Sequence, residues 1–385
     1  MPWKETYVMD ERIQFIAACL SGEETIAELC RRFGISRKTG YKLLGRYERE
    51  GAGGLEDRSR APLRQANAIG EAMEALLLEA RAKHPTWGPR KLLAWLSRRH
   101  PGHAWPAAST VGDLLRRHGL VISRRKRRLS ATPTDLQRPE AANQLWCADF
   151  KGWFPTGDGR RCTPLTITDA HSRYLLRCQA LGRRTGERLV RPIFEATFRE
   201  YGLPQAIRTD NGPPFAGLGL GGLSALSVWW IRLEIAVERI APGHPEQNGR
   251  HERMHRTLKA ETATPPAWTR RGQQGRFDRF RQEYNELRPH EALDQCPPAE
   301  LYQRSLRAYP SRLEEVVYDD DWVTRAVRGA GQMKWQGQDV RISQALAGQR
   351  IGLEPVDDGL WRVYFVHVPL GLFDERKKRV CPEKG

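Results

Sequence analysis

The stretch Leu145-Trp-Cys-Ala-Asp-Phe150 decides the fold, because it places an acid inside an apolar run that indicates a β-strand. Burying a carboxylate in such a strand is costly unless the group is paired or binds a metal ion. Asp149 is therefore a candidate metal ligand. The competing interpretation is an ordinary, satisfied acid in the core or at a strand edge.

Two further segments carry an acid in a comparable setting. Ile207-Arg-Thr-Asp-Asn-Gly212 ends a short apolar run, and Pro245-Glu-Gln-Asn-Gly-Arg-His-Glu252 leads into a polar helix. Asp210 precedes the turn dipeptide Asn211-Gly212, so taken alone it fits a turn residue as well as a metal ligand. Acids on separate elements of one sheet-and-helix core can converge on divalent ions, and together these acids predict a metal site.

The composition of the chain favours a folded protein that binds a polyanion. Its 385 residues predict roughly two to four domains, and a hydrophobic content of 39% is enough to build them. The formal net charge is +17, from 63 basic and 46 acidic residues, and the sequence pI is near 9.9. This balance is the electrostatic footprint of a nucleic-acid binder. The alternative is a basic enzyme whose charges are simply solvated.

The cysteine pattern and the hydropathy of the chain indicate in which cellular compartment the protein is found. Seven scattered cysteines with no C-x-x-C pair argue against a disulfide framework or a zinc ribbon and favour a reducing compartment. No apolar run approaches the ~18 residues of a membrane span. The N-terminus lacks the basic-then-apolar layout of a signal peptide. We therefore expect a soluble, intracellular protein without a membrane partner.

Residues 1–58 predict a helix-turn-helix DNA-binding domain. Apolar residues at helical spacing indicate helices over 11–20 and 25–33, and Ser36 is a plausible N-cap for a third helix. Gly40 lies where such helices usually bury a branched apolar residue, which weakens the match. The alternative is a helical packing module. Because the second helix of the motif enters the major groove, the residues expected to contact DNA are Arg37, Lys38, Lys42 and Arg46.

Residues 66–122 predict a second helical, helix-turn-helix-like DNA-binding domain, and residues 123–138 predict a basic linker. Between Leu114 and Thr134, seven residues are Arg or Lys and none is acidic. Like charges this close repel one another unless an anion neutralises them, and a phosphate backbone does so. The alternative is a solvated charge run or a chance resemblance to a nuclear-import signal. The residues expected to contact DNA here are Arg124, Arg125, Lys126, Arg127 and Arg128.

The residue pattern changes after the basic linker, and residues 139–305 predict a mixed α/β domain. Strands followed by strands that alternate with helices are typical of this class. The expected strands cover 143–154, 162–169, 172–180, 206–209 and 234–239, and the expected helices cover 185–201, 223–233 and 247–261. The last segment, 316–371, carries short alternating runs that predict a small antiparallel β-barrel.

Two acids compete for the third place in the metal site. Glu246 follows Pro245 at the start of the helix expected from about 247 to 261, where an acid is stabilised by the helix dipole for ordinary reasons. Glu252 lies one to two turns in, about 240° around the helix from Glu246, so the two cannot share a face. Glu252 does share a face with Arg256 and Lys259, which places basic groups beside a bound phosphate. We expect Glu252 to be the ligand and these two residues to contact DNA.

Acids arranged in this way suit phosphoryl transfer on a nucleic acid. That reaction asks the protein mainly for positioning and for stabilisation of charge. A pair of Mg²⁺ ions can activate the attacking oxygen and stabilise the leaving one. Because Mg²⁺ is hard and prefers oxygen ligands, carboxylates with open positions between them fit this need.

Five segments, taken in order, resemble the integrase-core transposases of bacterial insertion sequences, which are relatives of retroviral integrases. The segments are Leu145-Trp-Cys-Ala-Asp-Phe150, Thr168-Asp-Ala-His-Ser-Arg-Tyr174, Arg208-Thr-Asp-Asn-Gly212, Pro242-Gly-His-Pro-Glu-Gln-Asn-Gly-Arg-His-Glu-Arg253 and Tyr284-Asn-Glu-Leu-Arg-Pro-His290. The core motifs cover about 140–305, and the helix-turn-helix region upstream fits the same family. The resemblance implies a multidomain α/β protein with helix-turn-helix modules, a ribonuclease-H-like catalytic core and a small C-terminal β-barrel.

The resemblance also implies a site and a reaction. The site is a DDE triad of Asp149, Asp210 and Glu252 that holds Mg²⁺ or Mn²⁺ as two ions. In this family the catalytic Glu follows the Gly of a Gln-x-Gly element by three residues, and that Gly is Gly249 here, in agreement with Glu252. Between Asp210 and Glu252 lie 41 residues, whereas the 35 residues before Glu246 are the familiar spacing. An insertion around 217–227 would absorb the difference.

The implied reaction cuts DNA at the element's terminal inverted repeats and joins the freed 3′-hydroxyl to target DNA. The partners are double-stranded DNA and further copies of the chain, in the cytoplasm of a bacterium and associated with its nucleoid. Two alternatives remain open: a DNA-binding regulator built on an inactive integrase core, and a ribonuclease-H-like nuclease without strand joining. A fourth acid, Asp169, is expected to close a turn with Arg173 as partner, and a metal role is its lesser alternative.

Overall fold

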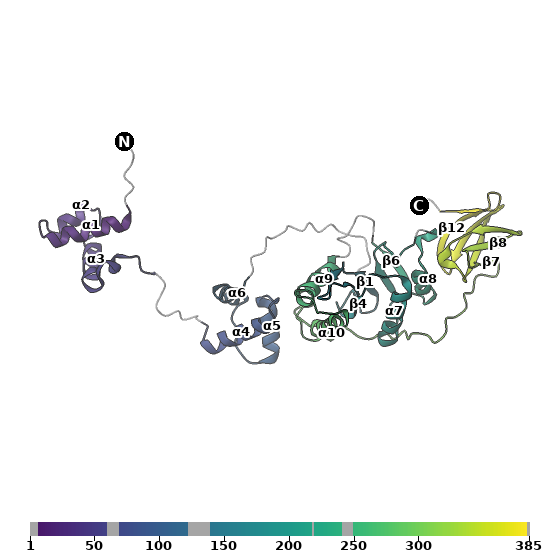
Figure 1. Cartoon of the computed structure of the whole chain (residues 1–385), viewed down its shortest axis with the longest axis horizontal. Helices are drawn as coiled ribbons and strands as arrows, with labels where there is room; N and C mark the ends of the chain where they lie inside the picture. Colours follow the sequence, from purple (N-terminus) through teal and green to yellow (C-terminus); the bar gives the residue numbers. More distant parts are fainter. Residues whose placement is uncertain (1–6, 60–68, 122–138, 218, 241–248, 383–385) are drawn as a thin grey trace, which may run out of the picture. The chain divides into compact units, whose positions relative to one another are not determined.

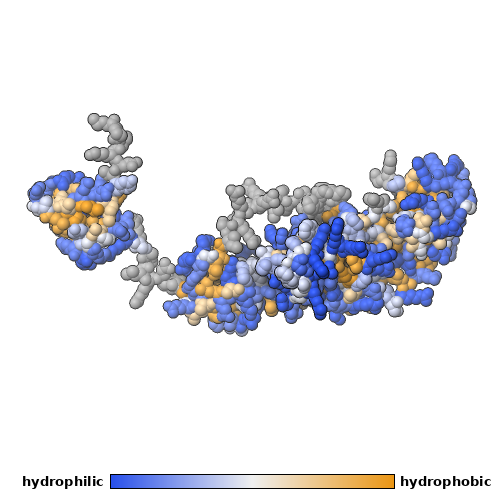
Figure 2. All heavy atoms as spheres, in the orientation of Figure 1, coloured by the Kyte–Doolittle hydropathy of each residue, from blue (hydrophilic) through white to orange (hydrophobic). Residues whose placement is uncertain are grey.

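The chain divides into two units, Met1–Gly70 and Glu71–Gly385 (Figure 1). The computed structural model describes residues 7–59, 69–121, 139–217, 219–240 and 249–382. The basic run Arg124–Arg128 and the acid Glu246 lie outside the described residues. Within the described ranges, no helix is both long and apolar enough to cross a bilayer. Hydrophilic side chains cover most of the surface seen in Figure 2.

Three helices build the first unit: α1 (Val8–Ser21), α2 (Ile26–Arg32) and α3 (Arg37–Glu50). A short 3₁₀ helix over Gly51–Leu55 follows them. Local hydrogen bonds set the helix starts: Thr25 forms a capping box at α2, and the Ser36 hydroxyl accepts from the Thr39 amide at α3. The predicted helices and the Ser36 cap are therefore confirmed.

Gly40 is explained by the packing of these helices. It is buried in α3, where a Cβ atom would lie 2.4 Å from Cys30 Sγ and 3.0 Å from Phe15 Cζ. Phe15 of α1 and Cys30 of α2 fill the space that a branched residue on α3 would otherwise need. The glycine is thus a packing feature and does not count against a three-helix DNA-binding module.

The second unit opens with another helical block, made of α4 (Glu71–Lys83), α5 (Pro89–Arg99) and α6 (Ala108–Arg117). Pro89 begins α5, where its missing N–H costs no hydrogen bond. Apolar side chains from each helix, among them Leu77, Leu92 and Leu114, are fully buried. The helical content predicted for residues 66–122 is therefore present.

A mixed sheet forms the next part of the chain. Its strands are β1 (Leu145–Phe150), β2 (Phe154–Pro155), β3 (Arg161–Asp169), β4 (Leu175–Leu181), β5 (Ala206–Thr209) and β6 (Ala236–Arg239). β3 pairs antiparallel with β1, β2 and β4, whereas β1–β5 and β5–β6 are parallel. This order is the ribonuclease-H-like arrangement that the resemblance implies. The strand expected over 143–154 is two strands, with a break at residues 151–153.

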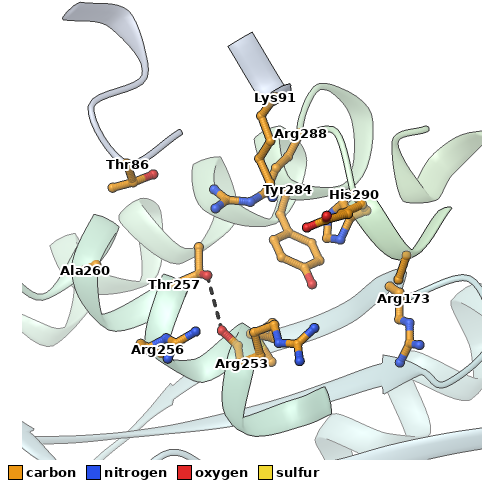
Figure 3. A pocket seen from close by; sticks show the side chains of 13 residues that line it. Thr86, Lys91, Arg173, Arg253, Arg256, Thr257, Ala260, Tyr284, Arg288 and His290 are labelled. Carbon is orange, nitrogen blue, oxygen red and sulfur yellow. Dashed lines mark hydrogen bonds between the residues drawn. The ribbon is translucent and has the colours of Figure 1, made fainter. Parts of the chain in front are cut away.

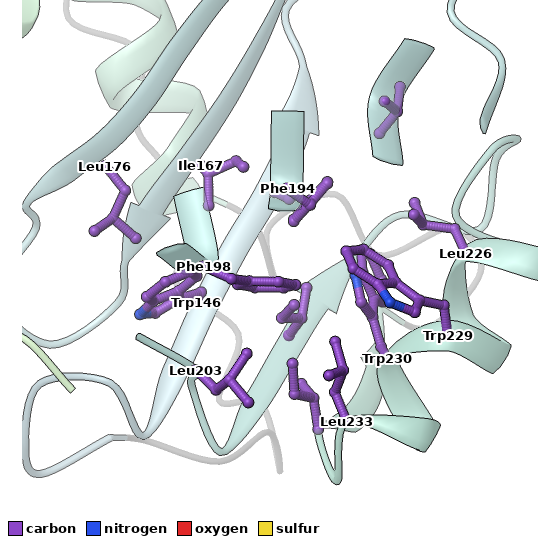
Figure 4. Packing of buried hydrophobic residues seen from close by; sticks show 14 of the residues in the cluster. Trp146, Ile167, Leu176, Phe194, Phe198, Leu203, Leu226, Trp229, Trp230 and Leu233 are labelled. Carbon is purple, nitrogen blue, oxygen red and sulfur yellow. The ribbon is translucent and has the colours of Figure 1, made fainter. Parts of the chain in front are cut away.

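Helices cover both faces of this sheet. On one face lie α7 (Glu187–Tyr201) and α8 (Ala225–Arg232), and on the other lie α9 (Gly249–Thr262) and α10 (Arg270–Glu286). Figure 4 shows the first face, where Trp146, Phe198 and Trp230 belong to one buried cluster. On the second face, Met254 of α9 and Phe277 of α10 pack against Cys178 of β4.

The helix α8 has no exposed polar face, and two hydrophobic clusters bury it from opposite directions. Trp229 and Trp230 face the sheet cluster, whereas Val228 and Ile231 belong to a second cluster made mainly of C-terminal residues. A helix without a polar face is stable only when it is buried in this way. Residues 219–224, just before α8, lie within the stretch around 217–227 where an insertion was expected, and a Cβ on Gly221 would lie 3.3 Å from Leu370 of the C-terminal part.

The C-terminal part is built of two sheets. A five-stranded antiparallel sheet has the order β13 (Arg379–Cys381), β12 (Val368–Asp374), β11 (Leu360–Phe365), β10 (Arg350–Asp357) and β7 (Val323–Ala326). A separate hairpin pairs β8 (Gln332–Trp335) with β9 (Gln338–Arg341). Within the described residues, no ladder joins the hairpin to β7 or β13, so the structure shows two sheets, and the closed barrel stays a prediction. Alternating patterns reveal strands but not which edges pair, and the strands run to Cys381, beyond the expected end at 371.

Candidate active site

Backbone pairing brings the first two predicted acids to neighbouring positions. β1 and β5 are parallel, with Leu145 opposite Ala206 and Cys147 opposite Arg208. The same register, two residues further along, puts Asp149 opposite Asp210. Both acids therefore lie at the carboxyl ends of adjacent parallel strands, where an α/β sheet commonly binds its ligands.

The alternation of side chains directs these acids to the face covered by α9. Trp146 and Ala148 of β1, and Ile207 of β5, belong to the cluster beneath α7 and α8. Successive residues of a strand point to opposite faces. Asp149 is one residue beyond Ala148 and Asp210 is three beyond Ile207, so both continue the side of the sheet that faces α9.

Glu252 reaches the same region from the first turn of α9, where it is exposed. With Asp149 it lines a cavity of about 570 Å³, which Arg256 and Lys259 also line. The helix face predicted for these residues is therefore confirmed. Asp210 does not line this cavity, and its link to Asp149 is the strand register together with the electrostatic effect described next.

Asp149 and Asp210 are weaker acids than free aspartate, because burial raises the pKa of both. Burial, followed by the charges of Asp210 and Glu252, raises the pKa of Asp149 to about 7, although the Phe150 amide and Lys151 act in the opposite direction. Burial also raises the pKa of Asp210, although the Gly212 amide donates to its Oδ1 at 3.3 Å. Repulsion between neighbouring carboxylates favours their protonated forms, and a divalent cation would relieve it.

A pair of histidines from α9 lies beneath Asp149, and the sequence reasoning did not find their arrangement. Thr166 Oγ1 of β3 lies 2.6 Å from Nε2 of His251 and 2.6 Å from Nε2 of His255. Thr168 Oγ1 lies 3.2 Å from Nδ1 of His251. On the other side, Nδ1 of His255 lies 3.8 Å from Asp149 Oδ2. The available signal was the four-residue spacing of the histidines, which places both rings on one face of a helix.

The hydroxyl of Thr166 limits how protons can be arranged in this group. Burial lowers the pKa of His251 to about 3 and that of His255 to about 2, so both rings are neutral at pH 7. A threonine hydroxyl has one proton, so it can donate to only one acceptor among the two rings and the Asp149 carbonyl, which lies 3.2 Å away. When Asp149 is ionised, the favourable state puts a proton on Nδ1 of His255, which then accepts from Thr166 through Nε2. His251 must in that case donate to Thr166.

The donor set of the site fits a hard divalent cation. Asp149, His251 and His255 each offer one atom within 4.8 Å of the others. Both histidine Nε2 atoms already lie against Thr166, which leaves the carboxylate oxygens as the better ligands. Carboxylate oxygens are what Mg²⁺ and Mn²⁺ prefer.

Asp169 serves the fold instead of the acidic site. It is 1% exposed, and its carboxylate accepts from the Asn143 amide and from both the amide and the hydroxyl of Ser172, at 2.6 to 2.7 Å. These bonds close the turn between β3 and β4, as predicted, and Arg173 takes part through its backbone amide, which donates to the Asp169 carbonyl at 3.1 Å. This turn delays the start of β4 to Leu175.

The residues predicted to contact DNA from the first unit separate into two groups. Arg37, Lys38 and Lys42 are exposed on α3. Arg46 is 8% exposed, and its guanidinium donates to the Glu56 carbonyl at 2.6 Å. Arg46 therefore ties α3 to the segment that follows it, whereas the other three residues predicted to contact DNA lie on the exposed surface of this helix.

The chain is similar to known protein domains along most of its length. An integrase core domain matches residues 139–245 and another matches 233–298. A helix-turn-helix domain matches residues 11–62, and a homeodomain-like domain matches 39–115. The C-terminal domain of the IS481 family transposases matches residues 322–381.

Individual relatives come from insertion elements. An uncharacterized 31.7 kDa protein of insertion element IS407 from Burkholderia multivorans is 28% identical over 254 residues, which cover 64% of this chain and 87% of that protein. An uncharacterized 39.2 kDa protein of insertion element IS476 from Xanthomonas euvesicatoria is 28% identical over 237 residues, which cover 60% of this chain and 64% of that protein.

Solved structures of viral integrases are more distantly similar. The HTLV-2 integrase catalytic core domain in complex with magnesium has a TM-score of 0.35 and 14% identity, and the match covers 43% of this chain and 100% of that one. A simian T-cell lymphotropic virus intasome in complex with PP2A regulatory subunit B56 gamma has a TM-score of 0.36 and 16% identity, over 80% of this chain and 100% of that one.

Proposed function

The chain is an integrase-core protein related to the transposases of insertion sequences, and on this premise we propose that it is a DDE transposase. It binds the ends of its element through its helix-turn-helix domains, cleaves DNA there and joins the 3′-hydroxyl ends to target DNA. We further propose that several copies of the chain act together on paired ends.

The observation that carries this proposal is the register of β1 and β5, which sets Asp149 opposite Asp210 on the side of the sheet that faces Glu252. These three residues would hold two Mg²⁺ or Mn²⁺ ions. When bound, the ions activate the attacking oxygen and stabilise the charge on the leaving one. A regulator built on an inactive core would have no need to keep these acids together, and a simple nuclease would have no need of the helix-turn-helix domains.

The remaining residues of the site bind and orient the phosphate. Lys151, Arg256 and Lys259 line the same cavity as Asp149 and Glu252. Their positive charges neutralise phosphates on either side of the bond that is cut, and they lie beside the acids without competing for the cation. Holding the reactants in line supplies much of the rate in phosphoryl transfer.

A strand-transfer assay with Mg²⁺ tests the proposal. Asp149→Asn, Asp210→Asn and Glu252→Gln should each reduce cleavage and joining to background, because each removes a metal ligand. All three variants should still bind element ends, because the helix-turn-helix domains are untouched. Glu246→Gln is the matched control and should keep its activity. Full activity in Glu252→Gln together with loss in Glu246→Gln would reverse the assignment of the third acid.

A further inference from the structure

A second cavity, of about 330 Å³, lies against α9 in the second unit (Figure 3). Its walls come from α9, from the end of α10 and the residues after it, from the turn between β3 and β4, and from the first turn of α5. Five basic side chains line it: Lys91, Arg173, Arg253, Arg256 and Arg288. Figure 3 shows most of these side chains, with the Tyr284 hydroxyl, pointing toward the same space.

Acidic side chains of the protein neutralise only part of the positive charge of these five residues. Arg288 pairs with Glu261 at 2.6 Å. The acid that lines the cavity, Glu291, pairs with Arg90 at 2.7 Å. Across the part of the chain that the structure describes, no carboxylate lies within 4.0 Å of the charged groups of Lys91, Arg253 or Arg256.

Lys91 is held in an environment that disfavours its charge. Burial, followed by the charge of Arg288, lowers the pKa of Lys91 to about 8. An anion in the cavity would raise this pKa again, because it would pair with the ammonium group and offset the charge of Arg288. The cavity therefore gains stability from an anionic ligand, in addition to having room for one.

Contacts within the second unit hold Lys91 in this position. Thr86 donates to Glu261 at 2.5 Å, and Arg98 pairs with Glu300. His84 lies 2.7 Å from Glu283 and stacks on Trp87 with ring centroids 3.8 Å apart. Trp87 is 1% exposed. These contacts join the α4–α6 block to α9, α10 and the residues after them.

The cavity is adjacent to the acidic site along α9. Arg256 and Ala260 line both cavities, so the two spaces share one helix as a wall. We propose that this second cavity binds a backbone phosphate of the same DNA that lies at the acidic site. The proposal rests on the proposed function for its source of phosphate. The chemistry it requires is a phosphate group, which either DNA or a free polyphosphate could supply.

Chemical labelling of Lys91 tests the site and separates the two sources. The full chain carrying Asp210→Asn, which should keep DNA intact, is acetylated at pH 7.5 and the modified lysines are measured by mass spectrometry. The three arms are no addition, a duplex of the DNA that flanks this gene, and inorganic tripolyphosphate. Lys377, which is exposed, lies outside the helix-turn-helix domains and does not line the cavity, is the internal control.

We expect the duplex to cause a loss of Lys91 labelling while Lys377 is unchanged, and tripolyphosphate to have little effect at the same phosphate concentration. Protection by tripolyphosphate but not by the duplex would overturn the DNA source. Absence of protection in both arms, or failure of the chain to bind the duplex, would overturn the site. The two proposals can also fail separately. If the duplex protects Lys91 but the unsubstituted chain joins no DNA, the phosphate site is supported and the proposed function is contradicted.

A pair of variants gives a second measurement. Lys91→Gln should weaken duplex binding about 10-fold at 0.1 M salt, as expected for the loss of a hydrogen bond to a charged group. It should also make the negative slope of log affinity against log salt shallower by about 0.9. Arg90→Gln, the neighbouring residue on α5, removes an exposed ion pair and does not line the cavity. Equal slopes for the two variants would contradict the proposal.

Discussion

At the scale of single residues, the carboxylate of Asp149 depends on groups that touch no substrate. Nδ1 of His255 lies 3.8 Å from its Oδ2, and Thr166 Oγ1 lies 2.6 Å from Nε2 of the same ring. Removing a group that orients a metal ligand from its outer shell costs about 10- to 100-fold in metal affinity or activity. We therefore treat His255 as a positioning residue.

His255→Gln should lower Mn²⁺ affinity and the rate of strand joining by about 10- to 100-fold. A glutamine amide can replace Nε2 beside Thr166, but it leaves no N–H near Asp149. The measurement is calorimetric titration of Mn²⁺ together with the joining assay. Met254→Leu, a volume-conserving change on the same turn of α9, is the control for packing. Unchanged Mn²⁺ affinity in His255→Gln would remove the positioning role.

At the scale of secondary-structure elements, the packing of α3 can be tested at two of its glycines. Gly40→Ala should destabilise the three-helix module, because the added Cβ would lie 2.4 Å from Cys30 Sγ, and overpacking a core costs about 1 to 3 kcal/mol. Gly45→Ala on the same helix meets nothing within 4 Å, so it should stabilise the helix by about 0.5 to 1 kcal/mol. Native-state hydrogen exchange of the α3 amides in the full chain measures both, and shifts of the same sign would contradict the packing argument.

At the scale of the whole molecule, stability should depend jointly on pH and on divalent metal. The pKa of Asp149 is raised to about 7 from its usual 3.8. The folded chain therefore binds this proton more tightly than the unfolded chain, and without metal the contribution of Asp149 to stability falls as pH rises from about 4 to about 7. Metal binding requires the ionised acid, so it favours the opposite trend.

Mg²⁺ should accordingly raise the melting temperature more at pH 8 than at pH 6. Differential scanning fluorimetry at matched ionic strength measures this difference, and Asp210→Asn should reduce it, because that variant removes one ligand and one repulsive charge. A shift that is the same at both pH values in the unsubstituted chain would show that Asp149 does not bind the metal.

The local features of this protein could be predicted from its sequence. The Ser36 cap, the helices α1 to α3, the individual strands and the three acids all depend on neighbouring residues and on periodicity, which are visible in the chain itself. The face that Glu252 shares with Arg256 and Lys259 follows from helical geometry alone. The assignment of the third acid between Glu246 and Glu252 stays a prediction.

What the sequence could not determine depends on pairing between distant segments. The pairing within the five-stranded sheet, the register that sets Asp149 opposite Asp210, and the contact of Thr166 with two histidines of α9 all join residues far apart in the chain. The burial of Arg46 likewise depends on how the chain returns at Glu56. Periodicity in the sequence shows which face of a helix or strand is apolar. Which element packs against that face depends on the free-energy difference between whole packed arrangements. Only the tertiary structure decides that difference.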